Sequence, residues 1–179
     1  MPVDLSMVEQ ARQGDASAFE SIYREYQSQI AGYLYRMVGD PEIAADLTQD
    51  VFLNAYRSIG RTQPGLNLRG WLYTIASNAA LSYHRRRKIV QWSPLDAGGN
   101  DAPTSGPEEQ VVNREELGAA LRALPPEQAA CILLSVRDGF SYQEIASMLG
   151  ISEGAVKTRT YRARLALARS LRASEESNA

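Results

Sequence analysis

A short segment of the chain concentrates side chains that can form hydrogen bonds with the edges of DNA bases. Arginine and lysine donate to guanine in the major groove, and hydroxyl groups pair with several bases. The same run of cations also fits the solvated face of an ordinary amphipathic helix, so the flanking sequence has to decide between the two interpretations. The candidate base-contacting side chains are Lys157, Thr158, Arg159, Tyr161 and Arg162.

The sequence around these residues predicts a helix-turn-helix. Ser141 is followed three residues later by Glu144, the spacing of a capping box that begins a helix. Gly150 suits the left-handed residue that ends this helix, and Ser152 can cap the next one. A capped helix, a tight turn and a basic second helix together favour DNA recognition. In the second helix the residues expected to face the core are Ala155, Val156, Ala163, Leu165 and Ala168.

A second group of polar side chains lies in the sequence ADLTQDVF. Steps of three and four residues place Asp46, Gln49 and Asp50 on one helical face, with Leu47 and Val51 on another. Carboxylates near a helix start are favoured by the helix dipole, so these residues can be solvated. The alternative is bidentate pairing with arginines of a partner helix.

The segment 67–88 combines aromatic, amide and basic side chains and ends in the run RRRK. Aromatic rings stack on unpaired bases while cations hold phosphates, so this composition is typical of binding to single-stranded or melted DNA. We expect Trp71, Tyr73 and Tyr83 to supply exposed aromatic surface, although Trp71 is equally suited to the core. His84 is expected on the same phosphate-facing surface.

Catalysis by this chain is not expected. With one His and one Cys among 179 residues, no catalytic triad, metal-ligand cluster or glycine-rich phosphate loop can be assembled. We therefore predict no enzymatic activity, no cofactor and no metal. Cys131 lies in an apolar run and is expected in the core. The polar N-terminus and the lack of a long apolar run predict a cytoplasmic protein without membrane insertion.

Helical periodicity over most of the chain, with no strand pattern, predicts an all-α fold of two small domains. The expected N-terminal helical domain spans 1–90, and the helix-turn-helix domain spans 113–174. Between them, residues 91–112 are rich in Pro, Gly, Ser and acids, a composition that predicts a flexible linker. Residues 175–179 are expected to be a disordered tail.

The order of these motifs resembles a bacterial extracytoplasmic-function (group IV) sigma factor of RNA polymerase. The resemblance runs through DLTQDVF, LRGWLYTIASN, RRRK and LPPEQAACILLSVRDGFSYQEIASMLGISEGAVKTRTYRARLAL, from about residue 11 to residue 171. It implies that Asp46, Gln49, Asp50 and Phe52 bind the clamp helices of the largest polymerase subunit. It also implies promoter DNA and an anti-sigma factor as partners.

The resemblance further implies how promoter elements are contacted. The loop 61–68 would form a pocket for a flipped base of the -10 element, and the basic helix of the second domain would contact the -35 element. The acidic linker residues Asp96, Asp101, Glu108 and Glu109 would mimic phosphates. Family members often carry a basic residue where Thr74 and Ser77 stand, which implies a weaker phosphate contact here. The implied -10 contacts are Asn67, Arg69, Asn78, Arg85, Arg86, Arg87 and Lys88; the implied -35 contacts are Lys157, Thr158, Arg159, Tyr161 and Arg162.

One alternative function remains open at this point. A conventional helix-turn-helix regulator would bind duplex operator DNA without polymerase, and its N-terminal helices would serve dimerisation or ligand sensing. A sigma factor would bind promoter DNA specifically only together with core polymerase.

Overall fold

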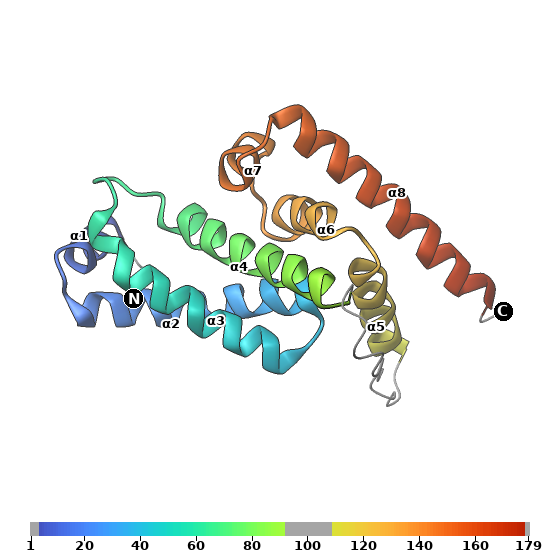
Figure 1. The fold of residues 1–179 in the computed structure, drawn as a ribbon, viewed down its shortest axis with the longest axis horizontal. Helices are drawn as coiled ribbons and strands as arrows, with labels where there is room; N and C mark the ends of the chain where they lie inside the picture. The colour runs from blue at the N-terminus through green and yellow to red at the C-terminus, as the bar shows by residue number, and fades with distance from the viewer. Residues whose placement is uncertain (1–3, 92–108, 178–179) are drawn as a thin grey trace.

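A computed structural model describes residues 4–91 and 109–177, with side chains described at 4–89 and 115–173 (Figure 1). Within these ranges the chain is helical and contains no strand, which confirms the all-α prediction. A 3-10 turn, η1, follows the third helix, and a π-helical segment, η2, follows the sixth. The elements are α1 (Leu5–Arg12), α2 (Ala16–Val38), α3 (Pro41–Ser58), η1 (Ile59–Arg61), α4 (Leu68–Gln91), α5 (Glu109–Arg122), α6 (Pro126–Ile132), η2 (Leu133–Arg137), α7 (Tyr142–Leu149) and α8 (Glu153–Ser177).

The N-terminal domain is built on α2, α3 and α4, which pack on one another. Helix α2 ends at Gly39, whose φ of 77° lies in the left-handed region that favours glycine. Asp40 then accepts hydrogen bonds from the N–H groups of Glu42 and Ile43 at 2.9 and 3.1 Å and caps α3. Two residues thus reverse the chain between the two helices, and Pro41 occupies the first turn of α3, where its missing N–H has no helical partner to lose.

Helix α1 is an element that the sequence interpretation missed. The Asp4 carboxylate accepts from the Met7 N–H at 2.8 Å and caps this helix. Val8 and Ala11 are buried against the rest of the domain. With only two buried residues in eight, the segment offers little of the apolar periodicity by which a helix is predicted.

The C-terminal domain contains the predicted helix-turn-helix. The Ser141 hydroxyl accepts from the Glu144 N–H at 3.2 Å, and the Glu144 carboxylate accepts from the Ser141 N–H at 2.8 Å. Gly150 has φ 64° and ends α7. Ser152 accepts from the Ala155 N–H at 3.1 Å at the start of α8. These contacts confirm the capping box, the glycine turn and the second cap.

The face of α8 that packs on the core differs partly from the prediction. Val156 and Ala163 are fully buried as expected. Leu165 is 45% exposed, and Ala168 is exposed as well, so the prediction for these two residues is wrong. Helix α8 is longer than the domain on which it packs, so its second half contacts fewer neighbouring side chains than its first half (Figure 1).

The bounds predicted for the linker and the tail also disagree with the observed ends of the helices. Helix α4 continues to Gln91, α5 begins at Glu109 and α8 ends at Ser177, so all three extend into ranges expected to lack structure. Residues 92–108 and 178–179 lie outside the described residues, and with them the predictions for Asp96, Asp101 and Glu108.

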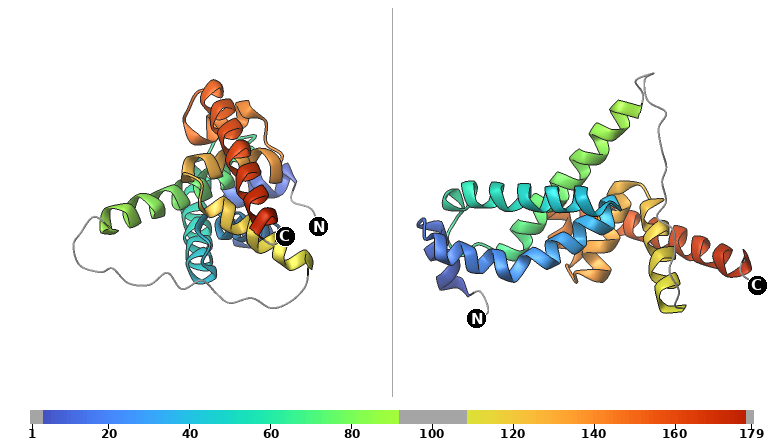
Figure 2. Two further views of the ribbon diagram at one scale, coloured as in Figure 1. Left: turned by 90° about the vertical axis from the view of Figure 1, so that its right-hand side faces the viewer. Right: turned by 90° about the horizontal axis from the view of Figure 1, so that it is seen from below.

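The two domains pack directly against each other. Helix α4 contacts α6 and α7, and α2 contacts α5 and α6, so the second domain covers one side of the first (Figures 1 and 2). The buried apolar residues of both domains form one continuous cluster. Within the part of the chain that the structure describes, no helix has the length and apolar character needed to cross a membrane.

Candidate nucleic-acid interface

The polar face predicted on α3 is present and exposed. Asp46, Gln49 and Asp50 are all exposed, while Leu47 and Val51 are buried beneath them. Among the described residues, neither carboxylate forms an ion pair. Two unpaired carboxylates and an amide on one helical face provide acceptors for arginine side chains of a partner.

Phe52 does not belong to this exposed face. Its side chain is only 4% exposed and meets the ring of Tyr23 edge-on, with centroids 4.9 Å apart. The next turns of α3 instead present Leu53 and Tyr56, which are 51% and 52% exposed. The sequence interpretation missed these two residues, although steps of three from Asp50 place them on the same side of the helix.

The basic end of α4 is exposed as predicted. Arg85, Arg86, Arg87 and Lys88 are exposed, as is Asn78. The Arg85 guanidinium donates to the Ser82 hydroxyl at 2.9 Å, and Arg87 donates to the Tyr83 hydroxyl at 3.4 Å. The end of α4 therefore carries a concentrated positive charge on its surface.

The aromatic side chains of α4 differ from the prediction. Tyr73 is fully buried, so the expectation that it supplies exposed surface is wrong. Trp71 and Tyr83 are half-buried and pack against the core. The His84 ring nitrogen Nε2 lies 2.8 Å from the carbonyl oxygen of Met37, so this residue joins α4 to α2 rather than facing phosphates.

Ser77, which the family resemblance placed among the phosphate-facing positions, is fully buried. Its hydroxyl lies 2.8 Å from the hydroxyl of Tyr33 on α2. A basic side chain at this position would place a charge inside the helix pair, which costs several kcal/mol unless it is paired. The absence of charge at Ser77 therefore belongs to core packing and does not weaken the exposed surface.

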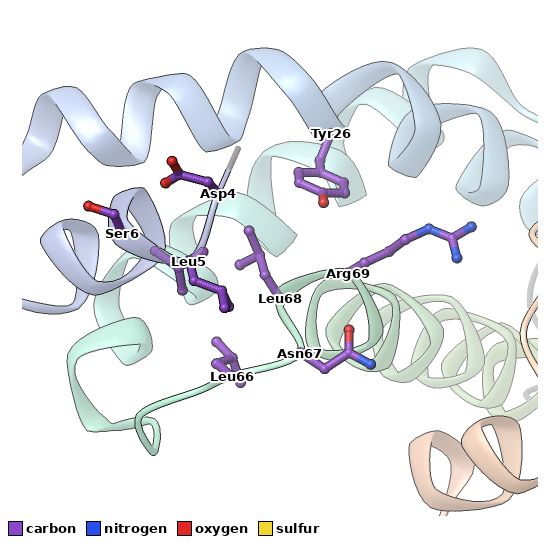
Figure 3. A pocket seen from close by; sticks show the side chains of 9 residues that line it. Asp4, Leu5, Ser6, Tyr26, Leu66, Asn67, Leu68 and Arg69 are labelled. Carbon is purple, nitrogen blue, oxygen red and sulfur yellow. The ribbon is translucent and has the colours of Figure 1, made fainter. Parts of the chain in front are cut away.

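A cavity of about 630 Å³ lies at the start of α4, between α1, α2 and the loop 62–67 (Figure 3). Arg12 fixes this loop, because its Nε donates to the carbonyl and hydroxyl oxygens of Thr62, each at 3.1 Å. Burial raises the pKa of Tyr26, so the phenol in the cavity wall stays neutral. Polar and apolar groups line the cavity together: Asp4, Leu5, Ser6, Val8, Tyr26, Leu66, Asn67, Leu68 and Arg69.

Asn67 and Arg69, two of the implied -10 contacts, lie at this cavity. Asn67 is exposed, and its side-chain oxygen accepts from the Gly70 N–H at 3.1 Å at the start of α4. Arg69 turns toward the second domain, where its guanidinium lies 4.2 Å from the centroid of the Phe140 ring. In this structure Asn67 is accessible, whereas Arg69 is occupied by a contact between the domains.

Helix α8 presents most of the side chains predicted to contact the -35 element to solvent. Lys157, Thr158, Tyr161 and Arg162 are exposed. Arg159 is half-buried and lies near the thiol of Cys131, so it is less accessible than its neighbours. Burial raises the pKa of Cys131 despite this arginine, and the thiol stays neutral in the core.

The described residues contain no group of three or more His, Cys, Asp or Glu side chains that could hold a metal ion. The exposed surface of the described residues includes the acidic face of α3, the basic end of α4 and the basic side chains of α8.

Comparison with protein families matches both domains. Residues 22–89 match the family described as Sigma-70 region 2, and residues 114–167 match Sigma-70, region 4. Among solved structures, CnrH in complex with the cytosolic domain of CnrY aligns with a TM-score of 0.73 at 23% identity, over 96% of this chain and 99% of that one. This similarity shows the fold. The sigma factor RpoE of Bartonella quintana, in complex with the anti-sigma factor NepR, aligns with a TM-score of 0.69 at 26% identity, over 86% and 96% of the two chains.

Two relatives that align with this chain over nearly their whole length identify the class of protein. The RNA polymerase sigma factor CarQ of Myxococcus xanthus is 34% identical over 156 residues, which cover 87% of this chain and 90% of CarQ. The ECF RNA polymerase sigma factor SigW of Bacillus subtilis (strain 168) is 31% identical over 177 residues, which cover 92% of this chain and 95% of SigW. The fold and its two regions thus define a sigma factor of RNA polymerase. The chain belongs to the extracytoplasmic-function (ECF) family.

Other relatives are longer than this chain. The ECF sigma factor BldN of Streptomyces coelicolor (strain ATCC BAA-471 / A3(2) / M145) is 37% identical over 175 residues, which cover 93% of this chain but 65% of BldN. The match to SigE of Mycolicibacterium smegmatis (strain ATCC 700084 / mc(2)155), at 35% identity, covers 62% of that protein. The chain therefore spans less than two thirds of the length of these two relatives.

Proposed function

We propose that this protein directs core RNA polymerase to promoters and initiates transcription there, without catalysis of its own. One observation carries the proposal: a single chain presents an unpaired acidic face on α3 and, on another domain, a capped basic recognition helix. A regulator that binds DNA alone needs only the second surface. Two surfaces of opposite charge suit one protein partner and one nucleic-acid partner.

The acidic face is the proposed contact with polymerase. Asp46, Gln49 and Asp50 accept hydrogen bonds from arginines on the clamp helices of the largest subunit, since carboxylates and guanidinium groups pair with two bonds in parallel. Leu53 and Tyr56 extend this contact with apolar surface. Phe52 supports it from beneath by packing on Tyr23.

The cavity at the start of α4 is the proposed site for a base flipped out of the melted -10 element. A base needs an apolar wall with a few polar groups at its edge, and Tyr26, Leu66 and Asn67 supply both kinds of surface. Asn78 and the basic residues 85–88 lie farther along the same helix, where they attract the phosphates of the strand. Arg69 joins this site once it is released from the second domain.

The recognition helix α8 is the proposed contact with the -35 element. Lys157, Thr158, Tyr161 and Arg162 are free to enter the major groove, and a good bidentate contact discriminates between bases by about 1–3 kcal/mol. Arg159 contributes only after its side chain leaves Cys131.

An anti-sigma factor is the proposed inhibitory partner, because the solved relatives CnrH and RpoE are bound to CnrY and to the anti-sigma factor NepR. The cytoplasm is the proposed compartment, since transcription takes place there.

A binding experiment separates this function from that of a conventional regulator. Duplex DNA fragments from the source genome are incubated with the protein alone, with core polymerase alone and with both. Sequence-specific complexes that form only with both components support the proposal. Specific complexes with the protein alone, unchanged by core polymerase, would contradict it.

A further inference from the structure

One of the residues that join the two domains, Arg69, is also a proposed contact with the -10 element. The Arg69 guanidinium donates to the carbonyl oxygen of Asp138 and lies over the ring of Phe140. The Tyr73 hydroxyl donates to the Asp138 carboxylate at 2.8 Å, and its ring meets that of Phe140 edge-on with centroids 5.1 Å apart. We call Arg69, Tyr73, Asp138 and Phe140 the interdomain cluster.

The interdomain cluster is shielded from water. Tyr73 is fully buried, Phe140 is 5% exposed, and the side chain of Asp138 is 7% exposed. Arg137 supplies a second cation, because its Nη1 lies 3.0 Å from Oδ1 of Asp138. The buried carboxylate is thus satisfied by Arg137 of its own domain and by the phenol of Tyr73, while Arg69 binds the carbonyl oxygen of the same residue. Separating the domains would remove the phenol from the carboxylate and Arg69 from the carbonyl.

Two glycines, Gly32 in α2 and Gly39 directly after it, let arginines of the second domain approach closely. A Cβ atom at Gly32 would lie 2.8 Å from Nη2 of Arg137. A Cβ atom at Gly39 would lie 2.1 Å from Cδ of Arg122, the last residue of α5. The contact between the domains thus has close packing at three separate places, which is the property of a defined interface.

This arrangement is incompatible with contact to both promoter elements. Their names place the -10 and -35 elements about 25 base pairs apart, which at about 3.4 Å per base pair is roughly 85 Å. In the structure α4 packs on α7, and α7 packs on α8. Packed helices are about 10 Å apart, so the recognition helix lies far closer to α4 than the two elements lie to each other.

We propose that the interdomain cluster holds the free protein in a closed state, and that Arg69 exchanges its contact with Asp138 and Phe140 for promoter DNA when polymerase separates the domains. The exchange rests on the proposed function of Arg69 at the -10 element. The closed state itself rests only on contacts within the chain. Because only open molecules bind melted DNA, closure multiplies the apparent association constant by the fraction of molecules that are open.

Distances between spin labels test the closed state without DNA. Ala45→Cys on α3 and Ala168→Cys on α8 place labels on exposed positions of the two domains, and Cys131 is fully buried and escapes labelling. Two variants weaken the cluster: Tyr73→Phe removes the hydroxyl but keeps the ring, and Asp138→Ala removes the acceptor. Tyr35→Phe on the exposed part of α2 is the matched control.

We expect one short distance in the parent protein and in Tyr35→Phe. Loss of a hydrogen bond to a charged group should raise the ratio of open to closed molecules about tenfold in Tyr73→Phe and in Asp138→Ala. A parent protein without the short distance would overturn the proposal. So would distances in both cluster variants that match the Tyr35→Phe control while circular dichroism shows all proteins folded.

A second measurement tests the exchange of Arg69. The free variants are titrated with a short, random-sequence single-stranded DNA that carries a fluorescent label. Tighter binding by Tyr73→Phe than by Tyr35→Phe supports the exchange. A variant that opens and binds this DNA no better than the control overturns the role of Arg69 at the -10 element, while the distances still establish the closed state.

Discussion

The hydroxyl groups of Tyr33 and Ser77 lie 2.8 Å apart in the interior of the N-terminal domain and join α2 to α4. Both side chains are fully buried, so neither group has water as an alternative partner. Burial raises the pKa of Tyr33, which keeps the phenol protonated and able to donate. This pair fixes the orientation of α4, and with it the basic residues at the end of that helix.

Tyr33→Phe should therefore destabilise the protein by about 1–3 kcal/mol, because it leaves the Ser77 hydroxyl buried without its partner. Urea denaturation at neutral pH measures the free energy of unfolding. Tyr35→Phe on the same helix changes an exposed tyrosine and serves as control. Equal stability of the two variants would show that the buried pair contributes nothing.

The capping box of α7 should make stability depend on pH. Hydrogen bonds from the N–H and hydroxyl groups of Ser141 lower the pKa of Glu144. A depressed pKa means that the ionised form stabilises the folded state. This contribution is present above the ordinary glutamate pKa of about 4.3 and disappears as the pH falls through the lower, folded value.

Glu144→Gln should thus be less stable than the parent protein at pH 7, with a difference that shrinks below about pH 4.3. Ser141→Ala should cost about 1 kcal/mol at pH 7 through loss of the cap. Thermal unfolding followed across the pH range checks both expectations. A difference between Glu144→Gln and the parent that stays constant down to pH 3 would refute the assignment.

Arg162→Ala on the recognition helix should weaken specific binding of polymerase holoenzyme to the -35 element about 10- to 100-fold, the effect of one lost bidentate base contact. Arg172→Ala near the end of α8 removes the same charge from an exposed position outside the recognition residues. Titration of holoenzyme with matched and mutated -35 duplexes separates specific from general binding. The same loss in both variants would mean that Arg162 supplies charge alone.

The acidic face of α3 should determine polymerase binding. Replacement of Asp46, Gln49 and Asp50 together by alanine removes the proposed arginine acceptors from exposed positions, so we expect at least a 100-fold weaker affinity for core polymerase and an unchanged fold. A control with alanine at the exposed acids Glu25 and Glu127 changes the net charge by the same amount. Copurification of the triple variant at parental affinity would refute the docking face.

The local signals in the sequence predicted much of the fold. The structure confirms the predicted helix ends at Ser141 with Glu144, at Gly150 and at Ser152, because a cap depends on residues within one turn. Helix α1 was missed because so few of its side chains are buried. Its importance arises through Arg12, which holds a loop fifty residues away.

The candidate site was harder to predict where a side chain depends on a distant partner. Phe52 and Ser77 occupy helical positions that pattern alone leaves open to solvent, and tertiary packing buries both. Tyr73 is buried between Tyr33 of its own domain and Phe140 of the second domain. No periodicity within α4 contains that information, since a contact between domains is set by the fit of two separate surfaces.

In vitro transcription with purified core polymerase tests the central claim most directly. A library of genomic fragments is transcribed with core polymerase alone, with this protein added and with the α3 triple variant added, and RNA 5′ ends are mapped. We predict defined start sites that require the protein and disappear with the triple variant, downstream of a shared pair of sequence elements. Absence of any start site that depends on the protein would contradict the claim.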